Sequence, residues 1–140
     1  MFNNKAKMAA RYARPFIGVP YKWGGETPMG GYDCSGFVQE ILNSVGMDPL
    51  GDQTAQALYD YFVGVGKLLH EPKIGCLIFF GQASIKVTHV GFMLNSLQMI
   101  EAGGGGRKTI DKQSAIDHRA FIRVRPYHYR RDLIQIINPF

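Results

Sequence analysis

Hydrophobic spacing divides the chain into a helical first part and a strand-like second part. Before residue 66, apolar residues recur every three or four positions, which predicts helices over residues 5–16, 34–46 and 54–63. Beyond it, short apolar runs separated by Gly, Pro, Asn and Ser are typical of strands, and they cover residues 67–70, 74–80, 87–94, 97–102 and 120–125. We therefore expect an α+β fold in which N-terminal helices pack on a mainly antiparallel β-sheet.

Two of these helices have apolar stripes through which we expect them to pack. The first helix has a modest stripe, which comes before the interrupting Pro15 and consists of Met8, Ala9, Tyr12 and Ala13. The helix that follows Cys34 has a broader stripe, which consists of Phe37, Val38, Ile41, Leu42 and Val45.

The length of 140 residues, 46% of them hydrophobic, suits one compact domain over residues 1–140. We find no internal repeat and no interdomain linker. Residues 127–140 lie beyond the last expected strand and are interpreted as a C-terminal extension. Its apolar residues either dock on a partner or pack on their own domain.

The formal net charge of +5 favours anionic partners such as nucleic acid, a membrane surface or a wall polymer, although such charges more often form a solvated face. No nucleic-acid motif accompanies the charge, so we expect no nucleic-acid partner. The chain has no apolar run of about 18 residues and its start is polar, so we expect neither a transmembrane segment nor a signal peptide.

The two cysteines differ in their sequence surroundings. Cys34 opens a predicted helix, whereas Cys76 lies in a strand-like run, and we expect both to be free thiols. Their spacing matches no metal-binding motif, so we expect no metal and no cofactor. At a helix N-terminus, unpaired N–H groups and the helix dipole favour a thiolate and can stabilise an oxyanion, which makes Cys34 a candidate nucleophile. The alternative is an ordinary buried cysteine.

A thiol nucleophile needs a base, and His89 is the one histidine of four that lies inside an apolar strand pattern. Glu101 lies in the next strand-like run, after a short turn at residues 95–96. In a hairpin it would be near-opposite His89 and could orient the imidazole. The alternatives are a core histidine with satisfied hydrogen bonds and an exposed strand carboxylate. Tyr21 and Trp23 precede the cysteine in a glycine-rich stretch, where they frame a substrate groove or pack in the core or at its rim.

Three ordered blocks resemble the NlpC-type peptidases of the papain-like cysteine peptidase group, which cleave bacterial cell-wall peptides. They are Pro20-Tyr-Lys-Trp-Gly-Gly with Asp33-Cys-Ser-Gly-Phe-Val, then Gly75-Cys-Leu-Ile-Phe-Phe, then Thr88-His-Val-Gly. The resemblance implies a papain-like fold with Cys34 as nucleophile, His89 as general base and Glu101 as the third polar residue. It also implies an oxyanion and substrate-binding region formed by Tyr21, Trp23, Asp33 and Ser35.

Two positions depart from the family pattern. Glu101 stands where the family usually has His, and sometimes Asn or Gln; a carboxylate can orient imidazole equally well and would change the pH optimum. Cys76 stands where the family usually has Asp, and we interpret it as structural.

The sequence therefore predicts a cysteine endopeptidase that hydrolyses an amide bond in peptidoglycan stem peptides through a Cys34 thioester. The chain also resembles small members carried in phage tails or phage-like particles. This resemblance implies synthesis in the cytoplasm, association with virion or tail proteins, and action at the cell wall or in the periplasm. The alternatives are a non-catalytic docking component of a particle and a thiol-dependent acyltransferase.

Overall fold

The structure is a computed structural model that describes residues 3–27 and 31–140. The described helices are α1 (Asn4–Ala13), α2 (Cys34–Asn43), α3 (Ala55–Val65) and α4 (Lys112–His118), with short 3₁₀ turns η1 (Arg14–Phe16) and η2 (Tyr127–Tyr129). The described strands are β1 (Glu26–Thr27), β2 (Gly31–Tyr32), β3 (Lys67–Leu69), β4 (Leu77–Ala83), β5 (Lys86–Met93), β6 (Gln98–Gly103), β7 (Phe121–Pro126) and β8 (Leu133–Asn138).

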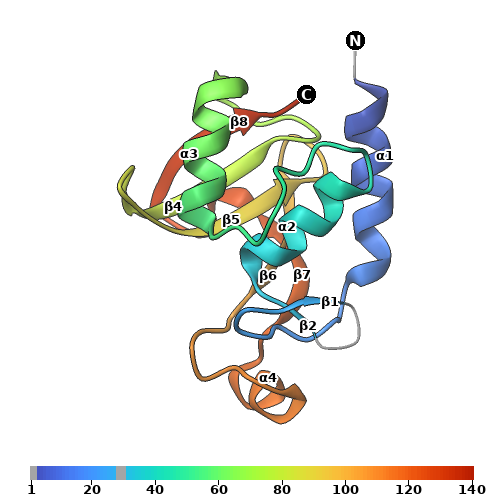
Figure 1. Cartoon of the computed structure of the whole chain (residues 1–140), viewed down its shortest axis with the longest axis vertical. Coiled ribbons are helices and arrows are strands. Elements are labelled where there is room, and N and C mark those ends of the chain that lie inside the picture. Colours follow the sequence, from blue (N-terminus) through green and yellow to red (C-terminus); the bar gives the residue numbers. More distant parts are fainter. Residues whose placement is uncertain (1–2, 28–30) are drawn as a thin grey trace.

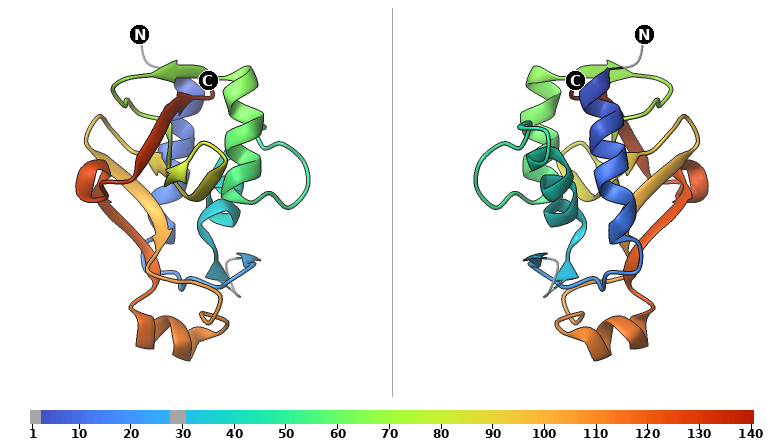
Figure 2. Two further views of the ribbon diagram at one scale, coloured as in Figure 1. Left: turned by 90° about the vertical axis from the view of Figure 1, so that its left-hand side faces the viewer. Right: turned by 90° about the vertical axis from the view of Figure 1, so that its right-hand side faces the viewer.

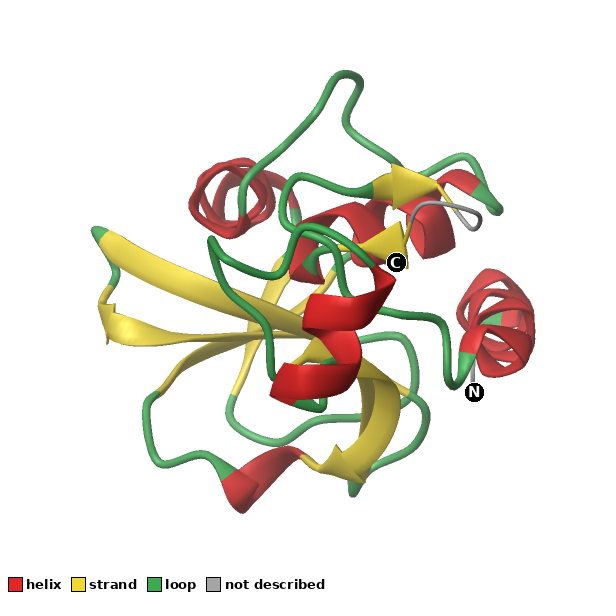
Figure 3. Cartoon of the chain, turned by 90° about the horizontal axis from the view of Figure 1, so that it is seen from below, coloured by secondary structure: helices red, strands yellow, loops and turns green. Residues whose placement is uncertain are grey.

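Six strands of the described chain form one sheet in the order β3-β8-β4-β5-β6-β7, and every neighbouring pair is antiparallel. Helices α3, α2 and α1 lie side by side next to this sheet (Figures 1 and 3). Helices α2 and α3 both contact β5, and α1 contacts α2. The predicted α+β fold with helices on an antiparallel sheet is confirmed.

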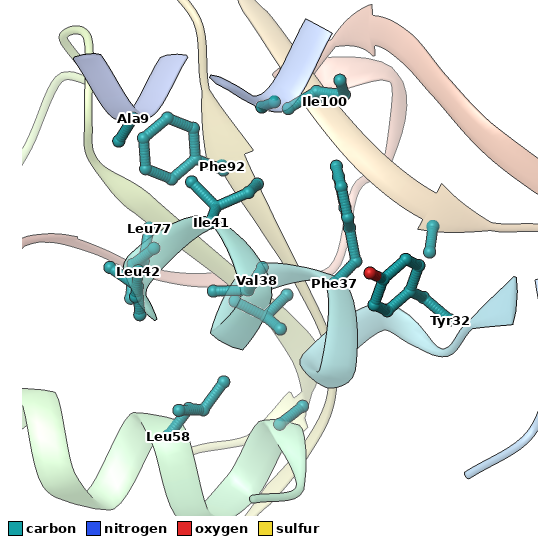
Figure 4. Packing of buried hydrophobic residues seen from close by; sticks show 14 of the residues in the cluster. Ala9, Tyr32, Phe37, Val38, Ile41, Leu42, Leu58, Leu77, Phe92 and Ile100 are labelled. Atoms are coloured by element: carbon teal, nitrogen blue, oxygen red, sulfur yellow. The ribbon is translucent and has the colours of Figure 1, made fainter. Parts of the chain in front are cut away.

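Helix α2 lies in the centre of the core. Its predicted stripe of Phe37, Val38, Ile41 and Leu42 is fully buried, and Val45 just beyond the helix is buried as well. Figure 4 shows this stripe among residues of the sheet and of α3, including Leu77, Phe92 and Leu58. Because burying one such side chain stabilises a fold by roughly 1.5–3 kcal/mol, α2 is firmly anchored, and so is its first residue, Cys34.

The predicted packing stripe of α1 is partly wrong. Met8 is 57% exposed and Tyr12 is also exposed, whereas the buried residues of α1 are all alanines: Ala6, Ala9, Ala10 and Ala13. Small side chains let the backbone of α1 lie close to the elements on which it packs, among them α2. The helix ends at Ala13, and Pro15 lies in the following 3₁₀ turn, as its position in the sequence indicates.

The interpretation of residues 127–140 as an extension beyond the last strand is wrong. Strand β8 lies inside the sheet between β3 and β4, and its Ile137 is opposite both Leu68 and Leu77. Ile136 and Ile137 are therefore buried in their own domain and Ile134 packs against its core, whereas Leu133 is exposed. In Figure 2, the C-terminal end of β8 lies close to the start of α1.

Helix α4 has no counterpart in the hydrophobic pattern. It lies at the end of the molecule farthest from the N-terminus (Figure 1), and Ala115 is its one buried residue. A helix with so narrow an apolar face gives no periodic signal. Its sequence signal is the capping box at its start, where Asp111 and Ser114 accept each other's backbone N–H groups. Of the described helices, none is long and apolar enough to span a bilayer.

Candidate active site

Cys34 is the first residue of α2, as the sequence predicts. The preceding Asp33 caps the helix: its carboxylate accepts hydrogen bonds from the amides of Gly36 at 2.7 Å and Gly24 at 3.1 Å. The Ser35 hydroxyl also donates to this carboxylate at 3.3 Å. Burial raises the pKa of Asp33, although these donors oppose the shift. The Asp33 side chain therefore fixes the start of the helix, in addition to lining a hollow beside Cys34.

The glycine-rich stretch before Cys34 lets two backbone segments approach closely. A Cβ atom at Gly36 would collide with the carbonyl oxygen of Gly25, so glycine is required on this face of the first helical turn. Among the described residues, the Cys34 and Ser35 amides have no hydrogen-bond acceptor. These free N–H groups of the first helical turn can donate to an oxyanion, which is the role expected of the Ser35 backbone.

Strands β5 and β6 bring His89 and Glu101 together. His89 Nε2 lies 2.5 Å from Glu101 Oε1, and the two side chains are 9% and 0% exposed. The hairpin prediction that placed them side by side is confirmed. The alternative of an exposed strand carboxylate at position 101 is wrong.

The second ring nitrogen of His89 is left for the cysteine. Because Nε2 contacts Glu101, Nδ1 is the nitrogen available to Cys34. Burial lowers the pKa of His89, but hydrogen bonds and charges from Cys34 and Glu101 outweigh it and raise the pKa to about 9. The Cys34 thiol also lies 4.0 Å from the carbonyl oxygen of Thr88, the preceding residue of β5. A raised histidine pKa means that the ring binds a proton more readily, and this is one requirement for a pair in which the proton of a thiol passes to a neighbouring imidazole.

Glu101 has further partners that sequence reasoning missed. The Tyr129 hydroxyl donates to Glu101 Oε2 at 2.9 Å, and the Nε atoms of Arg123 and Arg125 lie 3.7 and 4.0 Å from the same oxygen. Burial raises the pKa of Glu101, but His89, Tyr129 and Arg123 together lower it. The sequence does contain a signal for the two arginines, which alternate with apolar residues in the strand-like run at 120–125. In the structure this run is the strand next to β6, and Arg123 is directly opposite Glu101. No local pattern indicates Tyr129.

Two hollows meet at the cysteine. One, of about 260 Å³, extends over His89 toward residues 102–105, Tyr129 and Arg130. The other, of about 390 Å³, extends toward residues 52–55. Four residues line both: Tyr21, Trp23, Cys34 and Thr88. The two hollows together leave room for an extended chain to pass over Cys34 with contacts on both sides.

The two aromatic residues of the glycine-rich stretch have different environments. Trp23 is 50% exposed and lines both hollows, which contradicts a core position and agrees with a position at the rim or beside a substrate groove. Tyr21 is buried, and Gly105 packs so closely on its ring that a Cβ atom there would overlap it. Burial, followed by the charges of Cys34 and Asp33, raises the pKa of Tyr21, so its hydroxyl stays protonated beside Cys34.

Cys76 lies away from these hollows and is fully buried, and burial raises the pKa of its thiol. Neither cysteine forms a disulfide. Within residues 3–27 and 31–140, no group of three or more His, Cys, Asp or Glu side chains could hold a metal ion.

A cysteine that begins a buried helix, beside a histidine on an antiparallel sheet and a third polar residue that orients it, defines the papain-like class of cysteine peptidase domains. Residues 18–125 match the model of the NlpC/P60 family. The chain therefore belongs to the NlpC/P60 family.

Named relatives share this domain. The chain is 35% identical over 97 residues to a Bacillus subtilis protein named "Probable peptidoglycan endopeptidase LytE", covering 67% of this chain and 26% of that protein. It is 33% identical over 106 residues to a Listeria grayi protein named "Probable endopeptidase p60", covering 74% of this chain and 20% of that protein. The chain thus spans about a quarter or less of the length of these relatives.

Solved structures have the same fold. The NlpC/p60 domain of the peptidoglycan hydrolase SagA matches with a TM-score of 0.70 and 24% identity over 96% of this chain and 98% of that chain. RipD from Mycobacterium tuberculosis, a non-catalytic NlpC/p60 domain protein, matches with a TM-score of 0.68 and 20% identity over 98% of each chain. At these identities the likeness concerns the fold alone.

Proposed function

We propose that this chain is a cysteine endopeptidase that hydrolyses an amide bond in peptidoglycan stem peptides. The observation that carries the proposal is the position of Cys34 at a helix N-terminus beside His89, whose ring is held by the buried Glu101. The names of the full-length relatives support the substrate class. The net charge of +5 supports it as well, because stem peptides carry carboxylates that a basic protein attracts.

The geometry supports a two-step reaction. The Cys34 thiolate attacks the carbonyl carbon, and free amides of the first turn of α2 donate hydrogen bonds to the oxyanion. The His89 imidazolium then protonates the leaving amine as the C–N bond breaks, which leaves a thioester on Cys34. Water attacks the thioester while the neutral His89 takes its proton. The C–S bond then breaks and Cys34 leaves as a thiolate, which restores the thiolate–imidazolium pair, and the product is a carboxylic acid that ionises to the free carboxylate. Glu101 keeps the ring in position throughout.

The test is digestion of purified peptidoglycan by this protein and by its Cys34→Ala variant, with products identified by mass spectrometry. We expect new amino termini and peptide fragments with the unchanged protein alone, and the fragment masses will identify the bond. A new amide or ester product in place of a free carboxylate would indicate acyl transfer. No release from several wall types across the pH range would contradict the proposal.

A second candidate function is binding of peptidoglycan without turnover. The observation that favours it is Glu101, which stands at a position where the family usually has another residue. The non-catalytic structural relative shows that this fold is also found without catalysis. This function predicts that both the unchanged protein and Cys34→Ala sediment with insoluble peptidoglycan and that neither releases fragments.

We further propose the setting expected from the sequence, in which the chain is carried by a phage tail or a phage-like particle and reaches the wall from there. Strand β8 belongs to the sheet, so its apolar residues do not serve as a docking element in this proposal. The proposal is tested by mass spectrometry of purified particles from a producing host, in which peptides of this chain should co-purify with tail proteins. Their absence from intact particles would contradict it.

A further inference from the structure

Glu101 is a fully buried carboxylate, and neighbouring groups must stabilise the charge of its ionised form. In the described part of the chain, these groups come from three elements: His89 on β5, Arg123 and Arg125 on β7, and Tyr129 in η2. The nearby Arg130 adds a weaker charge interaction and is itself paired with Asp132. Glu101 thus has several partners, some of which supply charge and some of which make directional hydrogen bonds.

The two arginines supply positive charge without fixing direction. Their Nε atoms lie 3.7 and 4.0 Å from Glu101 Oε2, which is too long for a hydrogen bond, and Arg123 Nε has no hydrogen-bond partner in the described residues. Charge at this distance stabilises the carboxylate whichever way it is rotated. The arginines therefore fix the orientation of the carboxylate less sharply than a hydrogen bond does.

Tyr129 does select an orientation. Its hydroxyl lies 2.9 Å from Oε2 and 3.3 Å from Oε1 of Glu101, while Oε1 contacts His89. The shortest contact of Tyr129 is thus to Oε2, whereas His89 contacts Oε1, which Tyr129 reaches only at the longer distance. The Tyr129 ring is held in turn by the guanidinium of Arg125, 4.5 Å from its centre, and it lines the same hollow as Cys34 and His89.

We propose that Tyr129 is a positioning residue, which fixes the Glu101 carboxylate in the orientation that holds the His89 ring toward Cys34. This inference rests on the catalytic pair of the proposed function. It assigns an active-site role to the segment between β7 and β8. Strands β7 and β8 both belong to the sheet, and they hold the two ends of the segment that carries Tyr129.

The test compares Tyr129→Phe with Tyr127→Phe, which removes a hydroxyl from the same 3₁₀ turn away from Glu101. Two readouts need no substrate: the pKa of the His89 ring by NMR, and the rate of Cys34 alkylation by iodoacetamide at neutral pH. In Tyr129→Phe we expect the His89 pKa to fall by about one unit and the alkylation rate to fall several-fold, because a misoriented Glu101 stabilises the imidazolium less. Tyr127→Phe should match the unchanged protein.

A double-mutant cycle separates positioning from general stability. If Tyr129 acts through Glu101, Tyr129→Phe should change little more once Glu101→Gln is already present. On peptidoglycan, Tyr129→Phe should lower kcat about tenfold and leave KM within about twofold. An unchanged or higher His89 pKa in Tyr129→Phe, or equal losses in both backgrounds, would overturn the inference.

The outcomes also distinguish this inference from the proposed function. The expected NMR and alkylation changes without any peptidoglycan hydrolysis by the unchanged protein would contradict the proposed function alone. Hydrolysis by the unchanged protein with no change in Tyr129→Phe would overturn the role of Tyr129 alone. A Cys34 that alkylates no faster than a free thiol in the unchanged protein would contradict both.

Discussion

The two cysteines lie in opposite environments of one fold. Cys34 begins α2, is partly exposed to two hollows, and has His89 beside it. Cys76 precedes β4, is fully buried, and lies in a second apolar cluster with Ile78, Phe80 and Met93. Burial raises the pKa of the Cys76 thiol, which keeps it neutral. The two thiols therefore differ in their surroundings, and a helix terminus with a neighbouring imidazole is the environment that favours a reactive cysteine.

Replacing each cysteine in turn should give the largest difference in hydrolytic activity between two variants. Cys34→Ala should lower peptidoglycan hydrolysis by at least about 10³-fold, because the thioester cannot form, with the melting temperature nearly unchanged. Cys76→Ala should keep most of the activity and destabilise the fold by about 1 kcal/mol, because it removes buried contacts. Hydrolysis assays and thermal unfolding of both variants check this contrast, which fails if Cys76→Ala is the inactive variant.

Glu101→Gln tests how the imidazole beside Cys34 keeps its proton. The pKa of His89 is raised to about 9, so the imidazolium is present below that pH and is lost as pH rises through it. Without the carboxylate charge, the alkaline limit of activity should move to lower pH, and the rate near neutral pH should fall roughly tenfold to a hundredfold. The pH dependence of hydrolysis measures both effects. An unchanged alkaline limit would show that Glu101 does not act on His89.

The sequence predicts those parts of the fold and the site that residues close together in the chain form. Helix α2 and its start follow from a stripe of neighbouring residues and a capping aspartate. The contact between His89 and Glu101 follows from a hairpin with a short turn. The insertion of β8 between β3 and β4 joins segments more than 50 residues apart, so no local pattern contains it. Tyr129 was missed for the same reason, because its position depends on β8.

Gly105→Ala, with Gly106→Ala as its control, tests the wall of the smaller hollow. A Cβ atom at Gly105 overlaps the Tyr21 ring, whereas a Cβ atom at Gly106 meets nothing within 4 Å. We expect Gly105→Ala to displace Tyr21 and to lower kcat/KM by about tenfold, and Gly106→Ala to stay within about twofold of the unchanged protein. Steady-state kinetics with a soluble stem-peptide fragment compares the two. Equal values would show that Tyr21 has no part in binding or catalysis.

The smallest expected effect is that of salt on substrate binding. With a net charge of +5, the protein should bind anionic stem peptides less well as ionic strength rises, because salt screens exposed charges. We expect KM to increase a few-fold between about 0.05 and 0.5 M NaCl, with kcat nearly constant, since the buried contact between His89 and Glu101 is screened far less. Kinetics at several salt concentrations measures this. A fall in kcat with constant KM would contradict the expectation.

The most direct test of the central claim is the alkylation rate of each thiol at neutral pH, measured by mass spectrometry of the Cys34 and Cys76 peptides after timed exposure to iodoacetamide. We expect Cys34 to react at least about tenfold faster than a free thiol, His89→Ala to remove this advantage, and Cys76 to react only on unfolding. A Cys34 that reacts no faster than a free thiol would show that His89 does not activate it.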